Sequence, residues 1–322
     1  MTVRFSALPA VAAFAGAALL GVPVAAAFLL RPGSGAEASV APAVAPRPAA
    51  PVSSGPRFPA PPDGAVVFSQ QLGSDALALG VVPQGGHVLA QASVVGPQGT
   101  GVSGLAVTFA VQGTTKTAAA CGAGCYRATL AALGRPSSVD VVLRGVAAAH
   151  WRVELPASWP PPDGGALMAR AGAVWRSLRS LSFSESLASG SGQVVQSTWQ
   201  VGAPDRIAYQ VKGGWRAVIV GGTRWDKGPG GKHWVSSPQT PLTQPIPAWV
   251  KVTDAHILGS TTVDGRPAWR VSFYDPGTPG WFTVLVDKAS LHIYQVRMIA
   301  TAHFMRDDLG SFNATPAIVP PR

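Results

Sequence analysis

The sequence has few charged residues and few cysteines, and these shortages limit what the chain can be. Asp, Glu, Lys and Arg make up 12% of its 322 residues, and only two residues are cysteine. Glycine and proline are abundant instead, with 37 and 30 residues. This composition is typical of a turn-rich chain and excludes a coiled coil or a helical repeat. At about 150 residues per domain, the length allows roughly two domains.

Recognisable catalytic and cofactor motifs are also missing. The chain contains no Gly-x-Ser-x-Gly sequence, and Gly230-Gly231-Lys232 lacks both the leading glycine and the following Ser or Thr of a phosphate-binding loop. Its six histidines have neither HxH nor HxxxH spacing, and no pair of acidic residues suggests glycoside hydrolysis. We therefore predict no catalytic residue, no cofactor and no metal ligand, and we expect a non-enzymatic protein.

Most of the net charge of +10 lies in residues 163–322, which carry +6, and it does not form a run of lysines and arginines. A nucleic-acid-binding protein would need a basic stripe or a recognisable module, so we predict no nucleic-acid partner. Two interpretations of the charge stay open. It attracts the chain weakly to anionic lipid headgroups, or it only aids solubility.

Residues 5–30 contain no charged residue, and Arg4 and Arg31 flank them. As a helix they would be about 39 Å long, enough to cross a hydrocarbon core of about 30 Å with some tilt. A signal peptide has a shorter apolar region, which favours a transmembrane anchor, although Ala25-Ala26-Ala27 could be a cleavage site. Either alternative places the rest of the chain outside the cytoplasm, in the cell envelope.

The next segment, residues 31–63, is rich in proline and alanine. It has too few large apolar residues to form a core, so we expect a linker. In an extended polyproline conformation its reach would be on the order of 100 Å.

Short apolar runs alternate with turn signals over residues 64–157. Leu105, Val107, Phe109 and Val111 show the period of two that is typical of a half-buried strand. About seven runs recur at a spacing of roughly ten residues, which predicts an Ig-like β-sandwich. The Cys…Trp…Cys spacing of true immunoglobulin domains is absent.

The two cysteines lie four residues apart, in Cys121-Gly122-Ala123-Gly124-Cys125. In an extended strand this spacing is about 13 Å, too far for a disulfide, but the two glycines permit a tight bend. Outside the cytoplasm we expect a disulfide between Cys121 and Cys125. A soft-metal site for copper and a pair of free thiols are the alternatives.

The segment Cys121–Ala128, which precedes the apolar run Val139–Leu143, resembles the YtkA-like family of small envelope β-sandwiches. The resemblance covers about residues 70–145. Such domains occur beside copper-resistance membrane proteins, so the resemblance implies an accessory role in copper handling as one possible function.

Residues 163–318 are expected to begin with a helix and to continue as strands. Asp163 is a suitable N-cap for the helix. A one-sided apolar stripe follows it, formed by Leu167, Ala171, Val174, Trp175 and Leu178. About nine strands come next, including Trp249–Thr253. The last three, at residues 266–274, 281–287 and 291–302, have the clearest period of two.

One helix followed by antiparallel strands resembles the LolA/LppX-like lipoprotein-carrier superfamily. The residues that carry the resemblance are Val263–Trp269, Trp281–Asp287 and Val296–Met298, where a strand ends in Asp before a short turn. It implies a curved antiparallel sheet, an incomplete barrel with one or two packed helices, around an apolar cavity that holds acyl chains. The lining would consist of Trp199, Tyr209, Trp269, Phe273, Phe282 and Tyr294. The alternative is that these aromatic residues fill a solid core.

The sequence therefore predicts a mainly β, exported and membrane-tethered protein that binds an apolar or lipid-like ligand in the cell envelope. Its partners would be that ligand, the membrane through the N-terminal helix, and an envelope protein. Two alternative functions stay open: an accessory module of envelope copper handling, and an adhesion or sensing module that acts through protein contacts.

Overall fold

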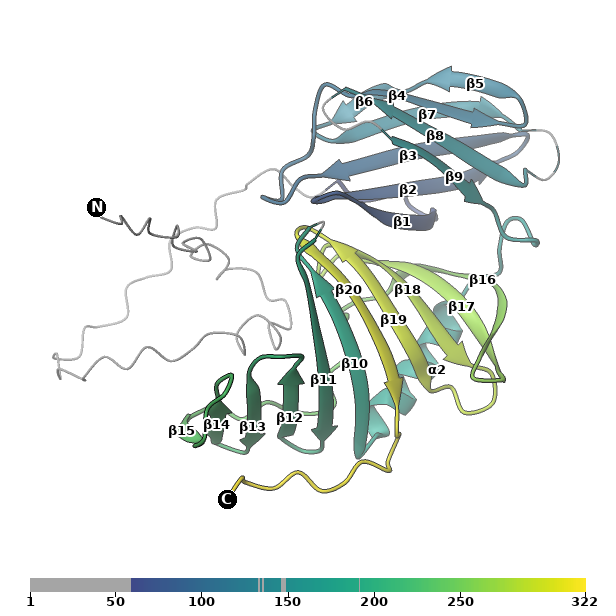
Figure 1. The fold of residues 1–322 in the computed structure, drawn as a ribbon. Helices are drawn as coiled ribbons and strands as arrows, with labels where there is room; N and C mark the ends of the chain where they lie inside the picture. Colours follow the sequence, from purple (N-terminus) through teal and green to yellow (C-terminus); the bar gives the residue numbers. More distant parts are fainter. Residues whose placement is uncertain (1–58, 133, 135, 146–148, 191) are drawn as a thin grey trace, which may run out of the picture.

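The computed structural model describes residues 59–322 except 133, 135, 146–148 and 191. The predicted N-terminal helix and most of the linker lie outside the described residues. The described part is mainly β, with one helix, and forms a two-sheet sandwich followed by an eleven-stranded sheet (Figure 1).

The sandwich consists of a five-stranded sheet with the order β1-β2-β3-β7-β6 and a four-stranded sheet with the order β5-β4-β8-β9. Its strands are β1 (Val66–Leu72), β2 (Asp75–Gln84), β3 (His87–Val95), β4 (Ala106–Val111), β5 (Thr114–Thr117), β6 (Ala119–Gly122), β7 (Cys125–Ala131), β8 (Ser138–Arg144) and β9 (Ala149–Glu154). Side chains of both sheets, such as Leu79, Phe109 and Val141, meet in one fully buried core. Nine strands therefore form where about seven were predicted.

A tight connection joins β6 to β7, and a disulfide links Cys121 to Cys125 across it, with 5.0 Å between their Cα atoms. Gly124 lies in this turn with a φ of +69°. A Cβ at this position would overlap the carbonyl oxygen of Val94. Only glycine fits this close approach of two backbone segments.

The second part contains helix α2 and a single antiparallel sheet, which is curved but not closed into a barrel (Figure 1). The elements are α2 (Gly165–Ser177), β10 (Ser180–Ala188), β11 (Val194–Gly202), β12 (Arg206–Val211), β13 (Arg216–Val220), β14 (Thr223–Lys227), β15 (Val235–Pro238), β16 (Thr253–Val263), β17 (Arg266–Asp275), β18 (Gly280–Asp287), β19 (Ile293–Ala300) and β20 (His303–Gly310). The N-cap of α2 is Gly164 and not Asp163 as predicted, because the chain turns into the helix one residue later. The Asp163 carboxylate still accepts a hydrogen bond from the Gly165 N–H (2.7 Å).

The strand order of this sheet is β15-β14-β13-β12-β11-β10-β20-β19-β18-β17-β16. The chain runs outward from β10 to the edge strand β15 and then returns from the opposite edge strand, β16, to β20. Residues 239–252, which we call the crossing segment, connect the two edges. Their side chains Leu242, Ala248, Trp249 and Val252 pack against the core of the sheet. The predicted strand at Trp249–Thr253 is wrong, because Trp249 lies in this irregular segment and β16 begins at Thr253.

One face of the sheet, the inner face, packs against α2 and the crossing segment. Period-two alternation places Val271 and Phe273 of β17, and Phe282 and Val284 of β18, on this face. Their neighbours Tyr274 and Trp281 therefore point to the outer face. The alternation in residues 266–298 thus separates a buried inner face from an outer face that is buried at Tyr274 and Trp281 but exposed at Arg270 and Arg297.

The outer face is also buried where Tyr274, Trp281 and Ile299 lie, because the sandwich packs against this part of the sheet. Val67 of β1 and Ala78 of β2 share a buried apolar cluster with Tyr274, Trp281 and Ile299 of the larger sheet. Burial raises the pKa of Tyr274 to about 12, and the neighbouring Asp275 adds to the rise. The two parts are therefore in direct contact through an apolar interface.

Candidate ligand-binding face

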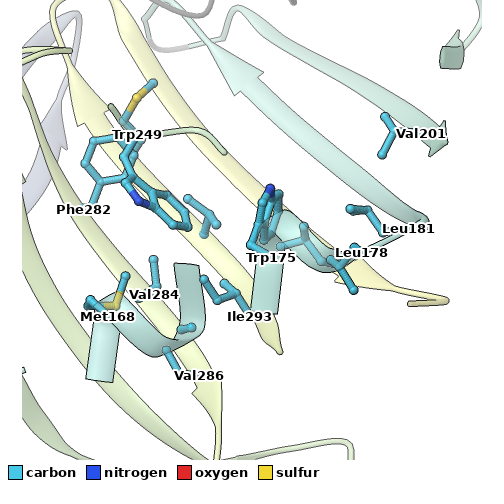
Figure 2. Close-up of a cluster of buried hydrophobic side chains, with 14 of the residues drawn as sticks. Met168, Trp175, Leu178, Leu181, Val201, Trp249, Phe282, Val284, Val286 and Ile293 are labelled. Atoms are coloured by element: carbon cyan, nitrogen blue, oxygen red, sulfur yellow. The ribbon is translucent and has the colours of Figure 1, made fainter. Parts of the chain in front are cut away.

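Three aromatic side chains meet on the inner face near the β16 edge of the sheet; Figure 2 labels two of them, Trp249 and Phe282. The rings of Phe273 and Phe282 stack at a centroid distance of 5.0 Å. Trp249 of the crossing segment approaches both rings edge-on, at 5.8 and 6.5 Å. Its other neighbour is Trp175 of α2, at 5.9 Å. Trp249 therefore fills the space between the helix and the sheet, where the lipoprotein-carrier resemblance predicts an apolar cavity.

The buried carboxylate of Asp275 fixes the end of the crossing segment. It accepts hydrogen bonds from the backbone N–H groups of Val250 (2.6 Å) and Lys251 (3.0 Å), immediately after Trp249. A third bond comes from the Gly277 N–H (2.7 Å). Hydrogen bonds to a carboxylate are stronger than bonds between neutral groups. One side chain thus holds the indole of Trp249 in place.

A second aromatic group lies on β10, β11 and β12. Trp199 stacks on Tyr209 at 4.5 Å and on Phe183 at 5.6 Å. The guanidinium of Arg224 donates a hydrogen bond to the Tyr209 hydroxyl (3.0 Å) and pairs with Asp226 (2.7 Å). Burial raises the pKa of Tyr209, although the positive charge of Arg224 opposes this rise. Polar groups therefore border this aromatic group on the β14 side.

A pair of buried carboxyl groups borders it on the other side. Glu185 of β10 and Asp307 of β20 lie directly opposite each other. Glu185 Oε2 accepts hydrogen bonds from the Ser197 hydroxyl (2.8 Å) and the Trp199 indole N–H (3.1 Å). Burial, and to a lesser degree the charges of Glu185 and Asp308, raise the pKa of Asp307 well above its ordinary value.

The last two predicted lining residues, Trp269 and Tyr294, each contact a basic side chain. Trp269 is half-buried, with the ammonium of Lys288 over its ring at 3.6 Å. The hydroxyl of Tyr294 accepts a hydrogen bond from Arg266 (2.8 Å), and its ring is 5.8 Å from that of Phe312. Of the six predicted residues, Trp199, Tyr209, Phe273 and Phe282 belong to one buried apolar cluster, and Trp269 packs against it.

Trp249 and Glu185 are functional candidates that the sequence analysis did not select. The apolar and polar residues around Trp249 alternate as in a strand. No local pattern therefore predicts that Trp249 lies in the segment that connects the two edges of the sheet. Asp275 is the last residue of β17, one residue beyond the predicted strand 266–274. A buried glutamate among serines gives no periodic signal, but an acidic residue at an inward position of a strand could have been noticed.

The described residues contain no group of three or more His, Cys, Asp or Glu side chains that could hold a metal ion. Cys121 and Cys125 form a disulfide, so their sulfurs are not thiolate ligands. No helix in the described ranges is long and apolar enough to span a bilayer.

No family model and no curated protein matches the chain. Part of the chain is similar to solved structures of lipoprotein LppX from Mycobacterium tuberculosis (12% identity, TM-score 0.38, 48% of this chain and 97% of that one) and of LprF from Mycobacterium bovis (12%, 0.37, 50% and 99%). A LolA superfamily protein from Nitrosomonas europaea is also similar (8%, 0.23, 48% and 95%). These identities and scores transfer neither a ligand nor an activity to this chain. The YtkA-like resemblance stays a prediction.

Proposed function

We propose that this chain binds an apolar, lipid-like ligand on the inner face of its large sheet, and that the ligand enters when the crossing segment moves away. The main observation behind the proposal is that Trp249 packs against the stacked rings of Phe273 and Phe282. Trp249 belongs to the crossing segment, which is irregular and contains prolines.

The dimensions of the sheet support this assignment. Eleven strands at about 4.8 Å spacing span about 48 Å, whereas a helix with its side chains is only about 10–12 Å wide. A stable two-layer domain normally covers an apolar sheet face with regular secondary structure. Here α2 covers part of the inner face, and a segment without helix or strand covers another part. Segments of this kind open more easily than strands, which suits a ligand-binding face.

Residues 5–30 and the linker support a location in the cell envelope, which is part of the same proposal. An apolar segment long enough to cross a bilayer would export the folded part and tether it in the cell envelope. The basic character of the chain, +10 overall, suits the neighbourhood of anionic lipids. The protein would act there as a binding protein without enzymatic activity.

A reversible lock on the crossing segment tests the proposal. A Cβ on Gly277 would lie 2.8 Å from the Cβ of Val250. This is about 1 Å closer than in a typical disulfide, and the 60% exposed Val250 can shift by that amount. In the double variant Val250→Cys/Gly277→Cys, we expect the oxidised form to lose binding of a neutral fluorescent acyl-chain probe and the reduced form to regain it.

The wild-type chain under the same reductant is the matched control, because it accounts for any effect of reducing Cys121–Cys125. Native extraction of the purified full chain, followed by mass spectrometry, should also recover an apolar molecule. The proposal fails if the wild-type chain binds no acyl-chain probe and carries no extractable lipid. Equal binding by the oxidised and reduced double variants would contradict entry beneath the crossing segment.

A further inference from the structure

Half of the net charge of the chain is concentrated in residues 206–238. This stretch contains six lysines and arginines and one aspartate, a net charge of +5 out of +10. The single aspartate, Asp226, already pairs with Arg224 (2.7 Å). Lys212, Arg216 and Lys232 are exposed. The free edge of the large sheet therefore carries more cationic than acidic side chains.

Three tryptophans gather at the same edge. The ring of Trp215 packs on Gly228, where a Cβ would lie 3.4 Å from it. The ammonium of Lys227 is 5.9 Å from the ring centroid of Trp234. Trp225 and Trp234 line an open cleft of about 330 Å³. The remaining lining residues of the cleft are Lys232, His233, Ser236, Pro321 and Arg322.

Strand alternation distributes these groups over both faces of the sheet edge. Arg224 points inward, because its guanidinium bonds to the Tyr209 hydroxyl on that face. Trp225 and Lys227 flank the inward-pointing Asp226 and so point to the outer face. Two exposed apolar side chains lie on the other side of the same edge: Val235, which pairs with the inward-pointing Asp226, is 69% exposed, and Trp215, in phase with the inward Ala217, is 37% exposed. The edge thus exposes groups on both faces, and it lies at the opposite end of the strand order from the Phe273–Phe282 pair on β17 and β18.

We propose that this edge, which we call the basic edge (Trp215, Trp225, Lys227, Lys232, Trp234 and Val235), is a docking surface for an anionic lipid bilayer. Tryptophan is enriched at the level of lipid headgroups, where its apolar ring and its N–H are both satisfied. Lysines near an anionic leaflet each contribute about 1 kcal/mol of attraction. A basic surface that only aided solubility would not also expose tryptophan and valine. The assignment goes beyond the proposed ligand and does not depend on it.

Tryptophan fluorescence provides the test, because the chain contains no tryptophan before Trp151. The full chain is bound to vesicles of phosphatidylcholine, with or without phosphatidylglycerol, that contain brominated acyl chains. An inserted N-terminal segment brings no fluorophore into the bilayer, so quenching reports only on the folded part. We expect quenching with phosphatidylglycerol, weaker quenching at high salt, and loss of most of it in the variant Trp215→Phe/Trp234→Phe. The control Trp151→Phe should keep it.

Charge variants make the test quantitative. Lys227→Gln/Lys232→Gln should raise the vesicle concentration needed for half-maximal quenching about 30-fold, at about 1 kcal/mol per lysine. Lys116→Gln/Lys251→Gln, which removes two exposed lysines elsewhere, should change it by less than about twofold. Quenching that does not depend on phosphatidylglycerol, or an equal effect of the two lysine pairs, would overturn the proposal. So would undiminished quenching in the tryptophan variant.

Discussion

Glu185 and Asp307 face each other across the ladder that joins β10 to β20, and both carboxyl groups are buried on the inner face. Glu185 has hydrogen-bond donors in Ser197 and Trp199, whereas Asp307 Oδ1 is buried without a protein partner. Burial raises the pKa of both groups. The folded protein therefore holds protons at this pair that the unfolded chain releases.

The first prediction concerns stability as a function of pH. Because the folded pKa of Asp307 lies above its ordinary value of 3.8, the folded state binds more protons than the unfolded state as pH rises past that value. The free energy of unfolding should therefore fall with rising pH, until the folded carboxyl has also titrated. Asp307→Asn should flatten this fall and be more stable than wild type at neutral pH. Chemical denaturation followed by fluorescence measures both.

The matched control is Asp308→Asn, which changes the exposed neighbour that pairs with Arg306 (3.1 Å). It should leave the slope of stability against pH almost unchanged. Glu185, with an ordinary pKa of 4.5 and also raised by burial, contributes in the same direction, so some slope should remain in Asp307→Asn. An unchanged slope in Asp307→Asn would contradict the assignment.

The second prediction concerns Asp275. In Asp275→Asn the amide oxygen can still accept, but the charge-assisted bonds to the N–H groups of Val250 and Lys251 weaken. We expect the crossing segment to open more easily by about 2 kcal/mol. This corresponds to hydrogen exchange about 30-fold faster at these two amides. Asp264→Asn, in the exposed turn between β16 and β17, should not change their exchange.

A third prediction compares two glycines of the sandwich that both have a positive φ. Gly124→Ala forces a Cβ into the carbonyl of Val94, whereas Gly113→Ala has no atom within 4 Å of its Cβ. Gly113→Ala should cost about 1 kcal/mol, from backbone strain alone. Gly124→Ala should cost about 3 kcal/mol, because overlap adds to the strain. Equal losses in thermal denaturation would show that the turn relaxes freely.

The fourth prediction addresses the contact between the sandwich and the large sheet. Val67→Asp places a charge in the apolar cluster that contains Tyr274 and Trp281. An unpaired buried charge is strongly unfavourable, so the two parts should separate before either unfolds. Limited proteolysis should then cleave between them, near residues 156–164. Thr115→Asp on exposed β5 should remain resistant.

Much of the fold could be predicted from local patterns, and the failures have identifiable causes. β17 and β18 were predicted almost to the residue, because their inner and outer positions alternate regularly. β20 was missed, because Asp307 occupies an inward position where an apolar residue would continue the pattern. The sequence analysis extended the preceding strand to residue 302 instead.

The candidate site was harder to predict than the strands. Four of the predicted aromatic residues, Trp199, Tyr209, Phe273 and Phe282, belong to the buried cluster on the inner face. No local signal showed that Trp249 would cover them, because that contact depends on a connection from one edge of the sheet to the other. The pairing of Glu185 with Asp307 joins positions more than a hundred residues apart, and a single sequence does not encode such a partner visibly.

The position of the β10–β20 ladder also has a consequence for how the protein forms. Within the described sheet it is the only ladder that joins the meander β10–β15 to the meander β16–β20. Each meander can form by pairing strands that are neighbours in sequence. The ladder that joins the two meanders can form only after β20, the last strand, is present. Because contacts between distant residues slow folding, we expect the two halves to form early and to join late. Until that moment the edge of β10 is unpaired, and a nascent chain would depend on other protection against aggregation.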